Sequence, residues 1–329
     1  MQLELDEIYG SGSWALNDAM VKSEHTFENT QLHCTSFANC DLHSDWQSNL
    51  INWRYEKYHG ENTNLTAPLR FNYSNDEMRL AADLIQIHIP SVNTSSESTI
   101  SKLATNFQLD EMEFRLGDVT SGGFGFSSSD FRLDSSIADI SNLAYSGKLQ
   151  LEADTLTGIL EIDLDQRLRI GIGLQHFFMR DTGDVVLKLA TYEFTETEPL
   201  TGLISPKELD ADIVAGQIEG LANISWSKQL DDSWRFGGPI ALKIDQLSGY
   251  YADYFFVDLN TDLFAEATTP LGIQVTNPAS ASLSLIDIGL PLEELSWQYR
   301  FDTLAAEVQV IDFHTALLGG KLSLSLIHI

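Results

Sequence analysis

The sequence predicts a mainly β protein, on three observations. Apolar residues recur at every second position over several stretches of strand length. No helical pattern long enough to cover one face of a sheet appears in the chain. The 329 residues are 43% hydrophobic, which suffices for a packed structure and excludes wholesale disorder.

The charge of the chain restricts its partners. Its 19 Lys and Arg residues against 48 Asp and Glu residues give a formal net charge of −29. Such a charge disfavours nucleic acid, whose phosphates require Lys and Arg, and disfavours adsorption to anionic lipid surfaces. Holding acyl chains is an apolar task and stays open. No run approaches the roughly 20 apolar residues that span a bilayer, so we expect any membrane anchor outside this chain.

The first predicted segment, residues 1–146, is β-rich and holds the only two cysteines. His33, Cys34, Cys40 and His43 offer four metal ligands, but zinc sites use separated pairs, and adjacent His33 and Cys34 give poor tetrahedral geometry. A disulfide between the cysteines would close a small loop, worth about 2 kcal/mol by loop entropy. We therefore favour the disulfide over free thiols and over a metal site. A disulfide indicates an oxidising compartment.

No motif in the chain indicates catalysis or a cofactor. The segment Ser121–Ser128 is glycine-rich like a phosphate loop, but it lacks the lysine and the following helix, so we interpret it as a turn between strands. Neither HExxH, nor GxSxG, nor a Cys–His pair with an orienting third group is present. With 48 acidic residues, chance carboxylate pairs do not identify a glycosidase. We predict no catalytic residue, no metal and no cofactor.

The second predicted segment, residues 147–285, opens with a meander of three amphipathic antiparallel strands, with acidic residues such as Glu161 and Asp163 on the solvent face. His176 is a lone histidine, which we interpret as a core or rim residue rather than a ligand. The predicted apolar face of the meander comprises Leu160, Ile162, Leu164, Leu168, Ile170, Ile172, Leu174, Val185, Leu187 and Leu189.

Further along this segment, a capping-box pattern at Ser205–Glu208 predicts a helical turn over residues 206–213. A period-two run of strand length follows, with glycines on its apolar face that leave room for close packing. The apolar members of this run that extend the predicted face are Val214, Ile218, Ile224 and Trp226.

The third predicted segment, residues 286–323, also reads as strands. Gly289 and Pro291 bracket a kink, because proline cannot donate to a sheet ladder. Val308, Val310 and Phe313 lie near period two and predict a strand with one apolar face. The pair Gly319–Gly320 indicates a turn or bulge. On the residues alone, this is a hairpin that any β-sandwich could contain.

Two short motifs in this segment carry a family resemblance. Residues 288–292, IGLPL, are similar to a "(V/I)G(V/I)PL" pattern, and residues 316–323, ALLGGKLS, are similar to an "LLGG-(K/R)-(V/L)-S" strand pair. In these motifs the chain resembles the YdbH-like family, AsmA/TamB-type envelope proteins of Gram-negative bacteria whose C-terminal region carries the label "dicarboxylate transport". The motif residues are Gly289, Pro291, Leu317, Leu318, Gly319 and Gly320.

The resemblance implies a fold and a function. The fold is a long, curved, mostly antiparallel sheet shaped as an open groove, and the protein is not an enzyme. Its apolar inner face would shield phospholipid acyl chains as they cross the periplasm between the inner and outer membranes. A segment outside this chain would anchor the protein to the inner membrane, and an outer-membrane lipoprotein would be a partner at the far end.

The residues alone leave two alternatives open. One is a structural or binding envelope protein, built as a β-sandwich or β-solenoid whose apolar faces pack on each other. The other is a carbohydrate-active β protein.

The two ends of the chain lead to a further expectation. Residues 324–329, LSLIHI, equal one reading frame of a transposase end sequence used in sequencing adaptors, so we interpret them as adaptor translation. Residues 1–7 have no basic region and no apolar region of a secretory signal. We therefore expect the chain to be a fragment of a longer protein.

Overall fold

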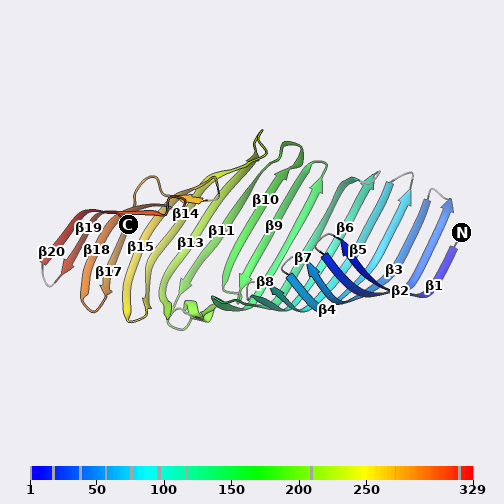
Figure 1. The fold of residues 1–329 in the computed structure, drawn as a ribbon, viewed down its shortest axis with the longest axis horizontal. Coiled ribbons are helices and arrows are strands. Elements are labelled where there is room, and N and C mark those ends of the chain that lie inside the picture. The colour runs from blue at the N-terminus through cyan, green and yellow to red at the C-terminus, as the bar shows by residue number, and fades with distance from the viewer. Residues whose placement is uncertain are drawn as a thin grey trace. The chain divides into compact units, whose positions relative to one another are not determined.

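The computed structural model describes residues 2–16, 19–36, 39–55, 58–74, 77–94, 98–115, 118–207, 210–270, 272–317 and 320–328. It consists almost wholly of long antiparallel strands (Figure 1). The mainly β prediction is therefore confirmed. The chain divides into two compact units, Met1–Asp165 and Gln166–Ile329, which are described separately below.

Unit 1 is an antiparallel meander in which each strand pairs with the next along the chain. Such pairing needs only short turns between strands. Its strands are β1 (Gln2–Leu16), β2 (Ala19–Ser36), β3 (Asn39–Tyr55), β4 (Tyr58–Ser74), β5 (Glu77–Thr94), β6 (Thr99–Arg115), β7 (Asp118–Asp134), β8 (Ala138–Glu152) and β9 (Thr155–Leu164).

Unit 2 is also antiparallel: β10 pairs with β11, β11 with β13, and the pairing continues through β14, β15, β17, β18, β19 and β20. The short β16 pairs with both β15 and β18. The elements are β10 (Leu168–Phe177), the 3-10 turn η1 (Phe178–Arg180), β11 (Thr182–Phe194), η2 (Leu200–Gly202), β12 (Ile204–Pro206), β13 (Ala211–Lys228), β14 (Trp234–Tyr251), β15 (Tyr254–Thr268), β16 (Gly272–Gln274), β17 (Ala279–Asp287), β18 (Pro291–Asp302), β19 (Glu307–Leu317) and β20 (Gly320–His328).

The strand register separates the side chains into an apolar face and a polar face. Residues opposite each other on paired strands share a face, and successive residues alternate between faces. In unit 1 the register aligns Phe126, Gly147 and Leu160 on one face, and Ser146 with Glu161 on the other. In unit 2, Ala265, Val275 and Ala279 form a small cluster of buried residues, with partly buried apolar neighbours packed against it.

Bulges at polar residues account for the curvature of the sheet within each unit (Figure 1). Among the described residues, eight inside strands adopt positive φ angles between 50° and 57°. Most are Asn or Asp, the side chains that tolerate this left-handed conformation best. A bulge bends its strand and increases the local twist. The residues are Asn29, Asn62, Asp130 and Asn142 in unit 1, and Gln246, Asp258, Glu294 and Asp312 in unit 2.

Polar side chains replace the ladder hydrogen bonds that the bulges interrupt. On β14 the backbone N–H of Gln246 donates to Oδ1 of Asn260 (2.9 Å). On β15 the backbone N–H of Asp258 donates to Oγ of Ser248 (3.0 Å). Backbone N–H and C=O groups whose ladder hydrogen bonds are broken by a bulge need such partners, because leaving them buried and unpaired costs free energy. Bulges on neighbouring strands thus stabilise each other.

Two local predictions are wrong. The predicted helical turn over residues 206–213 is absent from the part that the structure describes, because Pro206 ends β12 and residues 211–213 belong to β13, where they pair with β14. Residues 208 and 209 lie outside the described residues. The hydroxyl of Ser205 donates to the carbonyl of Thr201 instead of capping a helix. The glycine-rich segment Ser121–Ser128 is not a turn but lies inside β7. In both cases pairing along a long strand outweighs a local signal.

Other predictions stay untested. The predicted segment boundaries at residues 146 and 285 fall inside β8 and β17, and they remain predictions. Among the residues that the structure describes, no helix has the length and apolar character needed to cross a membrane.

Candidate functional site

The apolar face of each unit carries no second layer in the described parts of the chain. Contacts between elements run between strands that are neighbours in the sheet, and Figure 1 shows no helix or second sheet lying on either unit. An apolar sheet face normally packs against another element. In the described chain, the apolar side chains of each unit therefore pack against neighbours on their own sheet, and most of them are half-buried.

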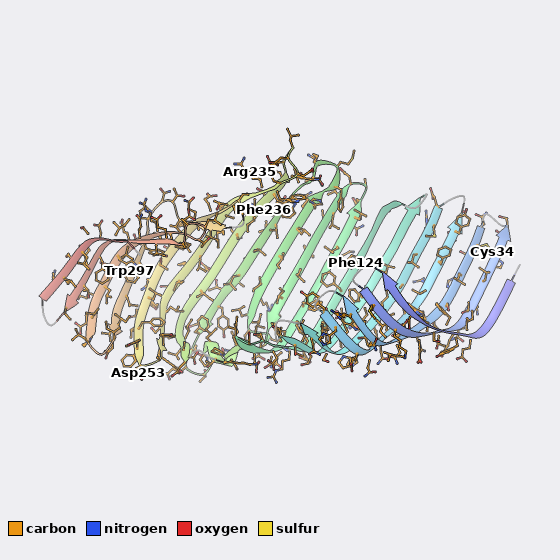
Figure 2. All side chains as sticks on the ribbon, viewed as in Figure 1. Cys34, Phe124, Arg235, Phe236, Asp253 and Trp297 are labelled. Atoms are coloured by element: carbon orange, nitrogen blue, oxygen red, sulfur yellow. A yellow bond between two sulfur atoms is a disulfide. The ribbon has the colours of Figure 1, made fainter. Side chains whose placement is uncertain are left out.

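Aromatic rings gather on the apolar face of unit 1. The rings of His25 and Phe27 on β2 lie parallel to Trp46 on β3, with centroids 6.0 and 6.3 Å from it. On β7, where Figure 2 labels Phe124, the ring of Phe126 lies 5.8 Å from Phe124 and 5.9 Å from Tyr145 on β8. Predicted site residues join this face through the β8–β9 register: Tyr145 opposes Ile162, Gly147 opposes Leu160, and Leu143 opposes Leu164.

Unit 2 brings most of the other predicted residues together. On β10 and β11, Ile170 opposes Leu189, Ile172 opposes Leu187, and Leu174 opposes Val185. The next register aligns Val185 with Ile224, and Gly183 with Trp226; beyond a bulge, Tyr192 opposes Ile218. Leu168 begins β10 and is buried.

Val214 differs from the other predicted members of this face. It lies at a register irregularity between Ile213 and Ala215, so the pairing of β13 with β14 does not assign it to either face. The period-two pattern that predicted it therefore breaks at this residue.

Aromatic rings occupy the room above two glycines of the apolar face. A Cβ atom on Gly147 would lie 2.6 Å from the ring of Phe126, and one on Gly183 would lie 2.5 Å from the ring of Trp226. Each ring crosses onto the neighbouring strand and covers the glycine there. The glycines thus let large rings lie flat against the sheet, as in aromatic rescue of glycine.

The sequence interpretation missed several members of the apolar face. Phe124 and Phe126 were assigned to a turn, although their spacing of two is a strand signal. In unit 2, Leu242 opposes both Gly220 and Leu263. The sequence predicted a strand here but did not assign Leu242 to the apolar face, although its alternation within Ile240–Ile244 is the signal that could have done so.

The polar face of unit 2 has a hollow of its own, of about 660 Å³. Across it, Lys243 opposes Glu219 on one side and Asp262 on the other, so cations and carboxylates alternate. Phe264, 71% exposed, lines the same hollow. This surface is distinct from the apolar face because its side chains point to the other side of the sheet.

The few buried polar groups near the start of unit 2 have structural partners. Arg167 donates from Nη2 to the Tyr192 hydroxyl (2.6 Å). Asp212, 7% exposed, accepts hydrogen bonds from the backbone N–H and the hydroxyl of Thr201 (3.0 and 2.6 Å). These bonds fasten the connection that holds η2 and β12.

Cys34 and Cys40 are bonded to each other in the structure, as a cross-strand pair of the β2–β3 hairpin. The four-ligand metal alternative therefore loses its two thiolates. In the parts of the chain that the structure describes, no group of three His, Cys, Asp or Glu side chains could hold a metal ion.

We expect this disulfide in protein isolated from an oxidising compartment. Without reduction, neither cysteine should react with an alkylating reagent, and both should react after reduction, as peptide mass spectrometry would measure. Two alkylated thiols in the unreduced sample would contradict the bond.

The motif residues of the third segment occupy hairpin ends. Gly289, with φ +87°, sits in the β17–β18 turn, where its N–H donates to Oδ1 of Asp287 (2.9 Å), and Pro291 begins β18. Leu317 ends β19 and Gly320 begins β20, whereas Leu318 and Gly319 lie outside the described residues. The bulge at Asp312 explains why Phe313 is displaced by one position from the alternation of Val308 and Val310.

The fold and site define a class: curved antiparallel sheet proteins whose strands present one apolar and one polar face. The model of the YdbH-like family, described as "Intermembrane phospholipid transport protein YdbH", matches residues 13–329. The chain belongs to this family, which is a lipid-transport family and not an enzyme family, and the predicted resemblance is confirmed. Comparisons with curated proteins and with solved structures gave no match.

Proposed function

We propose that the chain is part of a bridge that moves phospholipids between the inner and outer membranes, with acyl chains held along the apolar face of each unit. The uncovered apolar face carries this proposal, since a soluble sheet would otherwise bury it. The family match and the curvature within each unit support it.

The energetics suit a transport surface. Burying one methylene is worth about 0.8 kcal/mol, so a face several strands wide holds an acyl chain without any charged contact. Hydrophobic contacts have no preferred direction, so a chain moves from one position to the next with little change in free energy. A binding pocket with specific polar partners would instead fix the lipid in place.

The proposal includes a location and partners. The protein acts in the periplasm, which agrees with a disulfide between Cys34 and Cys40 because disulfides persist in oxidising compartments. A segment outside this chain holds it at the inner membrane, and an outer-membrane lipoprotein receives the lipid. The location and the two partners go beyond the family's role in phospholipid transport and belong to this proposal.

Crosslinking in cells tests the proposal. A photo-reactive residue at Ile162, Leu187 or Ile218 should form adducts with phospholipid, detected after protein purification by mass spectrometry. The matched control positions, Glu161 and Arg169, lie on the polar face of neighbouring strands and should form few or none. Equal labelling of both faces, or no lipid adduct from the apolar face, would contradict the groove.

A further inference from the structure

Two neighbouring hairpin ends of unit 2 combine exposed apolar side chains with cations. They are residues 176–181, where β10 ends and β11 begins, and residues 226–236, where β13 ends and β14 begins. We call these two segments the aromatic rim. The backbone N–H of Lys228 donates to the carbonyl of Asp181 (2.9 Å), which joins the two ends. Phe178, Met179, Leu230 and Trp234 are 50%, 85%, 109% and 40% exposed.

Polarity changes in a fixed order along the apolar face towards this rim. The aliphatic row of Leu174, Val185 and Ile224 comes first. The next row on the same face, two residues further along each strand, is His176, Gly183 and Trp226. Lys228 follows on the same face, opposite Trp234 and about 7 Å beyond Trp226. Membrane proteins present the same order of groups to a phospholipid: apolar side chains beside the acyl chains, aromatic rings at the interface, and cations near the headgroup.

Hydrogen bonding leaves a donor available at the rim. The indole Nε1–H of Trp226 donates to Nδ1 of His176 (3.2 Å), so the neutral imidazole carries its proton on Nε2. Phe178 packs edge-on against the same imidazole, with centroids 4.8 Å apart. The ammonium of Lys228 forms an ion pair with the exposed carboxylate of Asp232 (2.9 Å), of a kind that contributes little to stability and exchanges readily.

The opposite ends of the strands differ in charge. Figure 2 shows Arg235 and Phe236 at one end of β14 and Asp253 beyond its other end. In the β14–β15 and β17–β18 turns, residues 250–255 and 286–292 include Asp253 and Asp287 but no Lys or Arg. The aromatic rim has three cations, Arg180, Lys228 and Arg235, and three carboxylates, Asp181, Asp231 and Asp232, so it carries no formal net charge in a chain whose net charge is −29. At physiological ionic strength charges beyond about 8 Å are screened, so this local composition determines what the rim attracts.

We propose that the aromatic rim binds the phosphate group of a phospholipid whose acyl chains lie on the apolar face of unit 2. Nε2–H of His176 and the ammonium of Lys228 contact the phosphate, and the rings of Trp226, Phe178 and Trp234 surround the glycerol region. The acidic turns at the other ends of the strands repel phosphate, so the lipid takes one orientation. This inference rests on the proposed function, because it requires acyl chains on that face.

The dimensions agree with this orientation. From Ile218 to Trp226 the apolar face of β13 extends over eight residue steps, or about 27 Å. The acyl chains of one leaflet span about 15 Å, half of a bilayer core of about 30 Å. A lipid with its phosphate at the rim therefore keeps its chains over apolar side chains.

The test compares two lipids that share acyl chains and differ in the headgroup: dioleoylphosphatidylglycerol and dioleoylglycerol, which lacks the phosphate. Native mass spectrometry of the purified full chain measures the occupancy of each lipid at equal concentration. We expect about tenfold preference for the phospholipid, equivalent to about 1.4 kcal/mol. H176F combined with K228Q should remove the preference without lowering dioleoylglycerol occupancy, and D232N should increase it by releasing Lys228.

The control is K243Q, which removes the same charge from the polar face and should preserve the preference. Thermal unfolding of each variant verifies that it is folded. Equal occupancy of the two lipids in the unmodified chain, or a preference that survives H176F/K228Q, overturns the rim proposal while the groove stands. Failure of both lipids to bind overturns the proposed function itself.

Discussion

The variant Ile218→Arg is expected to lose bound phospholipid at least tenfold while remaining folded. Ile218 lies on the apolar face of β13, opposite Ile244 and Tyr192, and is only half-buried. On an open face the long side chain of arginine carries its charge to water, so the loss of folding free energy should stay below about 2 kcal/mol. Lipid occupancy falls because the guanidinium and its water shell displace acyl chains. Ile172→Asp on β10 should act in the same way.

The closest control is Leu221→Arg, three residues away on the same strand but on the polar face, where Leu221 is 50% exposed and opposes Lys188. It should leave lipid occupancy unchanged and lower stability by at most about 1 kcal/mol, because the new cation lies opposite Lys188. Lipid retained through purification, extracted and quantified, gives occupancy, and urea unfolding gives stability. In a closed sandwich the new charge would be trapped in a core and cost several kcal/mol. Unfolding of Ile218→Arg without any bound lipid in the parent chain would favour that alternative.

The second prediction concerns the stability of unit 2 and a glycine, Gly216, that lies beside the bulges of β13. Gly216→Ala is expected to destabilise unit 2 by about 2 to 4 kcal/mol. Gly216 has φ +104°, and a Cβ atom there would lie 2.5 Å from the carbonyl oxygen of Gln246 and from the Cα of Leu247. Backbone atoms at a bulge cannot move aside as a flexible side chain would.

Gly220→Ala provides the matched control, because it lies on the same strand. Its Cβ would meet Cβ of Leu189 at 3.5 Å and the carbonyl oxygen of Ala241 at 3.6 Å, which are ordinary contacts. Replacing this glycine also reduces the entropy of the unfolded chain, so the change in stability should stay within about 1 kcal/mol. The urea midpoint of each variant measures the effect. Equal losses at the two positions would show that bulge geometry does not limit residue 216.

The bulges also show where sequence reasoning stopped. Alternation over Leu160–Leu164 and Leu168–Leu174 predicted two strands and their apolar sides, which the structure places at β9 and β10. The same alternation could not predict Val214, because a bulge interrupts the register beside it. It also missed Phe124 and Phe126, because three glycines nearby resemble a turn until the long ladders of β6 and β8 hold them in a strand.

The sequence by itself predicted several of the strands, among them β9, β10 and β11, together with their two faces and the family, because alternation and short motifs are local properties of the chain. It also identified Cys34 and Cys40 as a pair, since their spacing admits a hairpin. Only the tertiary structure decided that the apolar faces have no second layer in the described chain, that bulges curve the sheet within each unit, and that His176, Trp226 and Lys228 meet at one rim. These properties depend on register between strands, and register arises from pairing over whole strands rather than from any residue alone.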